Sequence, residues 1–107
     1  MNASVQGQIW LAELPPPINQ RPVLVLTRTA AIPHLQNVAI ATISRRVRGI
    51  DTEVELTTSD GIKERCAVSL DKILTIPKPY LEGFVVELSA VRMAQVFEPL
   101  KIALDIP

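Results

Sequence analysis

Short apolar runs rich in β-branched residues recur along the first four fifths of the chain, and turn-forming residues separate them. This pattern predicts β-strands, because branched side chains suit a pleated sheet and the runs are short for helices. The expected strands cover residues 9–14, 23–27, 38–44, 53–57, 66–70, 73–76 and 84–88. The first four fifths of the chain are therefore expected to be mainly β.

The composition of single strands predicts which faces they bury. The continuous apolar runs at 23–27 and 38–44 indicate strands that are covered on both faces. The run at 53–57 alternates polar and apolar residues, which is typical of a strand with one solvent-exposed and one buried face. Prolines 15–17 should end the first strand, since proline cannot donate to a ladder.

The last part of the chain has a helical period instead. Apolar residues recur at intervals of four, three and four, at Met93, Phe97, Leu100 and Leu104. Ser89 is a suitable N-cap, and Pro99 is expected to kink or split the helix. A length of 107 residues suits one domain, so residues 1–107 are predicted to form a single small barrel of six or seven strands with a C-terminal helix.

Charge and cysteine content limit the kinds of partner and compartment. Eleven basic and eleven acidic residues leave no net charge, so any nucleic-acid binding must come from local clusters such as Arg45, Arg46 and Arg48. The single cysteine, Cys66, excludes an internal disulfide, and its neighbours predict a buried thiol on a strand. Neither a signal peptide nor a membrane-spanning run is recognisable, so a soluble, cytoplasmic protein that avoids membranes is expected.

Most familiar catalytic signatures are missing from the sequence. The four glycines are too dispersed for a phosphate-binding loop, and one histidine with one cysteine is too few for a usual metal site, so neither metal nor cofactor is expected. His34 has the chemistry of a general base, although a lone loop histidine is more often a solvated surface residue. Tyr80 is equally ambiguous, and Trp10 is better explained by packing in a core or interface than by base stacking.

Arg21 and Ser44 are the most informative polar residues. An arginine directly before a buried strand must project from the rim of the barrel, where its guanidinium could clamp a phosphate. Ser44 ends another predicted strand and precedes the basic cluster, so its hydroxyl could converge with these cations if the two strands are neighbours. These residue types alone indicate an anion site and no particular reaction.

Several short segments occur in a recognisable order along nearly the whole chain, about residues 6–104. The segments are Gly7-Gln8-Ile9-Trp10, Arg21-Pro22-Val23-Leu24-Val25, Ala41-Thr42-Ile43-Ser44, Leu70-Asp71-Lys72-Ile73-Leu74-Thr75-Ile76 and Leu88-Ser89. In this order and spacing they resemble the MazF/PemK family of toxins. The resemblance lies in the set of segments, since each segment alone is modest.

The resemblance implies an SH3-like barrel, shared with the gyrase poison CcdB, that acts as a homodimer. It implies the toxin of a type II toxin-antitoxin system, an mRNA interferase that cuts single-stranded RNA without metal and is inhibited by a cognate MazE-like antitoxin with an acidic tail. Attack by the 2′-hydroxyl would leave a 2′,3′-cyclic phosphate and a 5′-hydroxyl. Arg21 and Ser44 match the reactive positions, with serine in place of the more frequent threonine. Further RNA contacts are expected from Arg28, Arg45, Arg46 and Arg48.

Two other functions remain open from the sequence. A barrel of this kind could bind nucleic acid or protein without catalysis, with its rim arginines as simple phosphate contacts. It could also act on DNA gyrase, as CcdB does, although the Arg21-Pro22 and Ile43-Ser44 segments resemble the RNA-cleaving branch. An endoribonuclease would cleave RNA, a binding barrel would retain RNA without products, and a gyrase poison would trap DNA breaks.

Overall fold

The computed structural model describes residues 4–107, and these form six β-strands, one α-helix and three short 3₁₀ helices. In chain order they are β1 (Gln8–Glu13), β2 (Gln20–Val25), η1 (Thr29–His34), β3 (Asn37–Ser44), β4 (Glu53–Leu56), η2 (Thr58–Asp60), β5 (Cys66–Pro77), η3 (Lys78–Tyr80), β6 (Leu81–Glu87) and α1 (Ala90–Ala103). Within this part of the chain, no helix has both the length and the apolar character that crossing a membrane requires.

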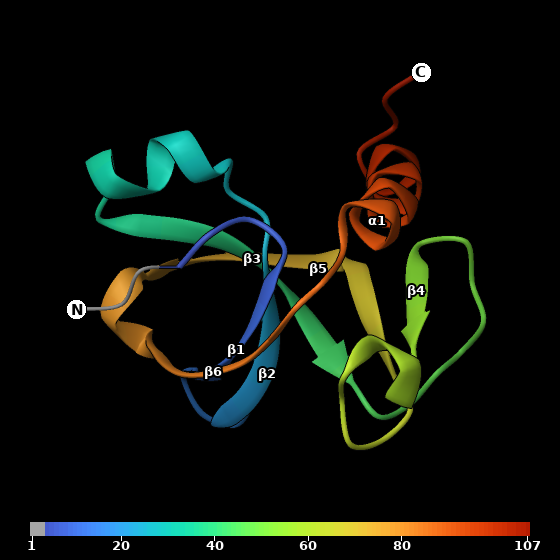
Figure 1. The fold of residues 1–107 in the computed structure, drawn as a ribbon, viewed down its shortest axis with the longest axis horizontal. Coiled ribbons are helices and arrows are strands. Elements are labelled where there is room, and N and C mark those ends of the chain that lie inside the picture. The colour runs from blue at the N-terminus through green and yellow to red at the C-terminus, as the bar shows by residue number, and fades with distance from the viewer. Residues whose placement is uncertain (1–3) are drawn as a thin grey trace.

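All six strands belong to one curled antiparallel sheet, in the order β4-β5-β3-β2-β1-β6 (Figure 1). The curl brings the loop after η2 against the opposite edge strand, β6. At Gly61 the φ angle is +90°, and a Cβ atom there would lie 2.8 Å from Cγ2 of Val86. Glycine satisfies both the backbone and the close approach. The predicted mainly β, barrel-like fold with a C-terminal helix is thus confirmed, as a curled sheet in which the loop after η2 lies against the edge strand β6.

The central strands bury both of their faces, as their continuous apolar runs predict. One face packs with α1 around Ile9, Leu24, Ile43, Leu56, Val68, Leu88, Met93 and Val96, among others. The other face packs with η1 around Ala12, Leu14, Val23, Val25, Ile32, Val38, Ile40, Ile76 and Leu81. β4 is half exposed, also as predicted, with Val54 and Leu56 buried and Glu55 exposed between them. We call the sheet face that packs against α1 the helix-side face, and the face that packs against η1 the η1-side face.

One predicted boundary between strands is wrong. The runs at 66–70 and 73–76 belong to one strand, β5, which pairs with β3 along both of its halves. Ala41 lies opposite Ile73, whereas the next residue, Thr42, lies opposite Ser69. The three residues in between, 70–72, therefore form a bulge that bends the strand without ending it. A bulge and a turn look alike in sequence, because both interrupt an apolar run.

The helix and the cysteine follow the sequence with two corrections. Ser89 is the N-cap, and its hydroxyl accepts a hydrogen bond from the backbone N–H of Arg92 at 3.2 Å. Pro99 does not split α1, which is one helix from Ala90 to Ala103. The predicted stripe ends early, because Leu104 lies at the C-cap and is 54% exposed. Cys66 is buried as predicted, and this burial, followed by the charge of Asp60, raises the pKa of its thiol.

Candidate active site

The η1-side face of the sheet changes from apolar to polar at the end of β3. Val23 of β2 lies opposite Thr42 of β3, so these two side chains share a face. Because side chains alternate along a strand, Arg21 is on the face of Val23 and Ser44 is on the face of Thr42. The strand register therefore brings Arg21, Thr42 and Ser44 to the same face, one residue pair beyond the apolar core.

A row of buried polar side chains crosses this end of the sheet. Ser69 of β5 lies opposite Thr42 on one side and opposite Glu53 of β4 on the other. Thr42 is 8% exposed, Ser69 is 4% exposed, and the side chain of Glu53 is 4% exposed. Oγ of Ser69 has no hydrogen-bond partner within residues 4–107. Burying an unpaired hydroxyl such as that of Ser69 costs free energy, so this group is unusual for a core and more typical of a site.

The bulge of β5 borders this polar row. Oγ1 of Thr52 donates a hydrogen bond to Oδ2 of Asp71 at 2.5 Å, and the backbone N–H of Leu70 donates to the carbonyl oxygen of Thr52 at 2.9 Å. These two bonds tie the bulge to the residue just before β4. The bulge thereby holds Asp71 and Lys72 at the same end of the sheet as Arg21 and Ser44.

Together these elements enclose a cleft of about 450 Å³. Its lining combines four cationic side chains, three hydroxyls and two carboxylates with a few apolar groups: Ile18, Arg21, Thr42, Ser44, Arg46, Arg48, Glu53, Ser69, Asp71, Lys72, Ile73 and Leu74. Both carboxylates accept hydrogen bonds from the protein itself. The groups left to a ligand are mainly hydrogen-bond donors, which favours an anion. We call this hollow the basic cleft.

Ser44 is oriented by the chain that follows it. Its Oγ accepts a hydrogen bond from the backbone N–H of Arg46 at 3.1 Å. A hydroxyl has one proton to donate, and this bond uses only a lone pair of the oxygen. The Ser44 hydroxyl therefore retains its proton for a ligand in the basic cleft.

Glu53 fixes the loop that carries the basic residues. Its Oε1 accepts from the backbone N–H of Arg48 at 2.9 Å and of Gly49 at 3.2 Å, and its Oε2 accepts from Nε of Arg48 at 3.2 Å. Desolvation alone would raise the pKa of Glu53, but the hydrogen bonds from Arg48 and Gly49 outweigh it and lower the pKa below the usual 4.5. The carboxylate is therefore charged at neutral pH and engaged on both oxygens.

The structure divides the six predicted site residues into two groups. Arg21, Ser44, Arg46 and Arg48 all line the basic cleft. Arg45 points elsewhere, since its side chain is 85% exposed and lies 3.4 Å from a carboxylate oxygen of Glu64. Arg28 precedes η1 and is not part of the cleft lining.

The sequence analysis missed five polar members of the cleft: Thr42, Glu53, Ser69, Asp71 and Lys72. Thr42 had a usable signal, because it stands two residues before Ser44 on one strand and so shares its face. Ser69 and Glu53 had none, since only the pairing of β3, β5 and β4 brings them together. Asp71 and Lys72 reach the cleft through the bulge, which the sequence did not reveal.

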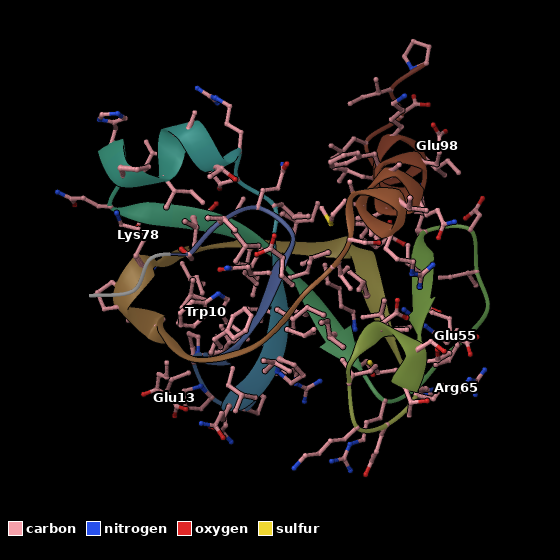
Figure 2. The ribbon with its side chains drawn as sticks, viewed as in Figure 1. Trp10, Glu13, Glu55, Arg65, Lys78 and Glu98 are labelled. Carbon is pink, nitrogen blue, oxygen red and sulfur yellow. The ribbon has the colours of Figure 1, made fainter. Side chains whose placement is uncertain are left out.

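A second hollow, of about 1110 Å³, lies at the other end of the η1-side face. It is bordered by prolines, by Trp10 and by a few polar groups: Pro33, His34, Leu35, Gln36, Asn37, Pro77, Lys78, Pro79, Leu81 and Glu82 complete the lining. Trp10 stacks edge-on against Phe84, with ring centroids 5.9 Å apart, and Figure 2 shows Trp10 and Lys78 on the same side of the molecule. We call this hollow the proline groove. His34 belongs to it and not to the basic cleft.

Metal ligands are not clustered in the described residues. Among residues 4–107, no group of three or more histidine, cysteine, aspartate and glutamate side chains is arranged to hold a metal ion. The basic cleft offers a ligand its guanidinium, ammonium and hydroxyl groups.

A curled sheet with a C-terminal helix and a small cleft lined by arginines and hydroxyls defines a class of small β proteins with a site suited to an anion. Within this class, residues 5–104 match the sequence model of the PemK-like, MazF-like toxins of type II toxin-antitoxin systems. The chain belongs to this family.

Individual relatives are similar over almost their full lengths. The chain is 36% identical over 101 residues to a probable endoribonuclease, MazF5, of Mycobacterium tuberculosis, covering 94% of this chain and 92% of the relative. Among solved structures, it resembles the M. tuberculosis toxin MazF-mt6 with a TM-score of 0.86 and 36% identity, over 94% of this chain and 98% of that one. A mycobacterial endoribonuclease in complex with its cognate antitoxin gives a TM-score of 0.87 at 25% identity, with 97% of each chain covered.

Proposed function

We propose that this protein is the toxin of a type II toxin-antitoxin system and a metal-independent endoribonuclease that cuts single-stranded RNA, including mRNA, in the cytoplasm. The observation that carries the proposal is the convergence of Arg21, Ser44, Arg46 and Arg48 on one cleft whose free groups are hydrogen-bond donors. The relatives named as endoribonucleases support the same activity. An extended RNA strand supplies the phosphates that such a cleft would bind.

Arg21 and Ser44 are the proposed catalytic residues. The 2′-hydroxyl of the substrate attacks the adjacent phosphorus and loses its proton, while the bond from phosphorus to the 5′-oxygen breaks and that oxygen takes up a proton. The products are a 2′,3′-cyclic phosphate and a 5′-hydroxyl. Arg21 stabilises the negative charge that grows on the non-bridging oxygens, and the Ser44 hydroxyl donates to one of them. Such preorganised electrostatic stabilisation is commonly the largest catalytic contribution.

Cleavage of a mixed-sequence single-stranded RNA in the presence of EDTA tests this proposal. We expect the wild-type protein to release fragments that polynucleotide kinase labels without prior phosphatase treatment, because their 5′ ends carry hydroxyls. Arg21→Ala is expected to lower the rate by at least about a thousandfold. Arg65→Ala is the matched control, since Arg65 is an exposed arginine outside the cleft lining. Equal cleavage by the Arg21→Ala and Arg65→Ala variants would exclude Arg21 from the site.

The proposed partners are a second copy of the chain and a cognate MazE-like antitoxin. A solved relative forms a complex with its antitoxin, and the four cations of the basic cleft suit an acidic segment. Sedimentation of the purified chain as a dimer would support self-association, and sedimentation only as a monomer would contradict it. Rescue of growth by the product of an adjacent small gene is the expected sign of the antitoxin.

A further inference from the structure

The carboxylate of Glu53 on β4 holds the loop at residues 45–52, which carries Arg46 and Arg48. Both of its oxygens are used, in three bonds to Arg48 and Gly49, and its side chain is only 4% exposed. Gly49 has a φ of +71°, a left-handed conformation that turns its N–H toward the carboxylate. The loop at residues 45–52 therefore has a fixed shape where it passes the basic cleft.

The guanidinium of Arg48 is the side chain that this arrangement orients. Its Nε donates to Glu53, which leaves its two terminal nitrogens for other acceptors, and the side chain is 43% exposed. An arginine whose orientation is set beforehand loses less conformational freedom when it binds a phosphate. Because both oxygens of Glu53 are occupied, the carboxylate itself is poorly placed to act on a substrate.

A second glutamate on the same strand provides an internal comparison. Glu55 shares the face of Glu53 and pairs with Arg65 through bonds of 2.5 and 3.2 Å. Figure 2 shows Glu55 and Arg65 side by side at the β4 edge of the molecule. Neither residue lines the basic cleft. One strand thus carries two glutamate-arginine pairs, and only one of them borders the cleft.

We propose that Glu53 is a positioning residue, which holds Arg48 against the wall of the basic cleft so that its guanidinium binds an RNA phosphate. This inference rests on the proposed function for the identity of the ligand. Glu53 acts through Arg48, and its removal is expected to weaken RNA binding without removing a group that touches the reacting atoms.

Binding and structure together test the proposal. The binding probe is a mixed-sequence single-stranded RNA with every 2′-hydroxyl methylated, which cannot be cleaved, and Kd is followed by fluorescence anisotropy. Glu53→Gln keeps the shape of the side chain and is expected to raise Kd about tenfold, because it removes the charge that holds the guanidinium. Glu55→Gln, the matched control, is expected to change Kd less than about twofold.

A double variant separates positioning from general destabilisation. If Glu53 acts through Arg48, Glu53→Gln has little further effect on Kd once Arg48→Ala is present. Full additivity of the two changes, or equal Kd values for the Glu53→Gln and Glu55→Gln variants, would overturn the proposal. Cleavage by the Glu53→Gln variant should show a raised KM and a nearly unchanged kcat, whereas a fall in kcat alone would contradict it.

The structural arm does not depend on RNA. In ¹⁵N NMR spectra of the free protein, the Nε–H signal of Arg48 should be protected from exchange with water. Glu53→Gln should abolish this protection, and Glu55→Gln should leave it in place. An unprotected Arg48 signal in the wild type would refute the positioning role. Failure of the wild type to bind or cut RNA, with the Arg48 signal protected, would refute the proposed function and leave the positioning of Arg48 standing.

Discussion

The two hollows on the η1-side face differ in both size and chemistry. The basic cleft has about 450 Å³ and four cations in its lining, whereas the proline groove has about 1110 Å³ and is bordered by prolines and Trp10, with His34, Lys78 and Glu82 as its titratable groups. The larger hollow would attract attention first if volume were the guide. The smaller one has the donors that phosphate chemistry requires.

The difference between the hollows arises from one sheet face. Where β2 and β3 carry Val25 and Ile40, the face is apolar core, and where they carry Arg21, Thr42 and Ser44, it becomes the floor of the basic cleft. The same alternation of side chains thus forms an apolar core at one end of the face and the basic cleft at the other. Hydrogen-bond donors and strand register favour the basic cleft as the site, whereas volume alone would favour the proline groove. Variants in the two hollows distinguish these alternatives.

The largest expected effect comes from Arg21→Lys in the basic cleft. Lysine retains the charge but lacks the planar pair of donors, so cleavage should fall by about a thousandfold while the fold is unchanged. Single-turnover cleavage of RNA, with circular dichroism as a control for folding, measures this. Near-normal cleavage by the lysine variant would show that charge alone suffices at this position.

Removal of the Ser44 hydroxyl should have a smaller effect. Ser44→Ala is expected to slow cleavage by about tenfold to a hundredfold, because one neutral donor to the transition state is lost. Ser44→Thr keeps the hydroxyl and should remain within about threefold of the wild type. Comparison of kcat for the two variants isolates the hydroxyl, and equal losses in both would assign the effect to packing.

The pair of Glu53 with Arg48 should make the free energy of unfolding depend on pH. The pKa of Glu53 is lowered in the folded state, mainly because its hydrogen bonds outweigh burial, so this carboxylate stabilises the fold above pH 4.5 and the contribution is lost as the pH falls further. Glu53→Gln should lower Tm by about 4 °C at pH 7, and the gap from the wild type should close below pH 4.5. Thermal melts from pH 3 to 7 measure both curves, and a constant gap would contradict the linkage.

The smallest expected effect is that of His34→Ala in the proline groove. Because His34 lies outside the lining of the basic cleft, cleavage should change by less than about twofold at neutral pH. A pH-rate profile of this variant that matches the wild type would sharpen the distinction between the hollows. A loss comparable to that of Ser44→Ala would break it and place catalysis at the larger hollow.

The sequence by itself predicted a large share of the fold. The strand positions, the two-sided burial of the central strands, the Ser89 cap and the buried Cys66 all follow from patterns that span a few residues. The order of the family segments also singled out Arg21 and Ser44, and the structure places both in one cleft. These features are local, or depend on segments read one after another along the chain.

The tertiary structure decided everything that depends on strand pairing. Only the register of β3, β5 and β4 aligns Thr42, Ser69 and Glu53, and only the bulge at 70–72 brings Lys72 to the cleft. The structure also separated Arg46 and Arg48 from Arg45, although all three lie within four residues of each other. The reason is that pairing partners lie far apart in sequence, and a loop arginine has no period that fixes its direction. Here Glu53 supplies that direction for Arg48.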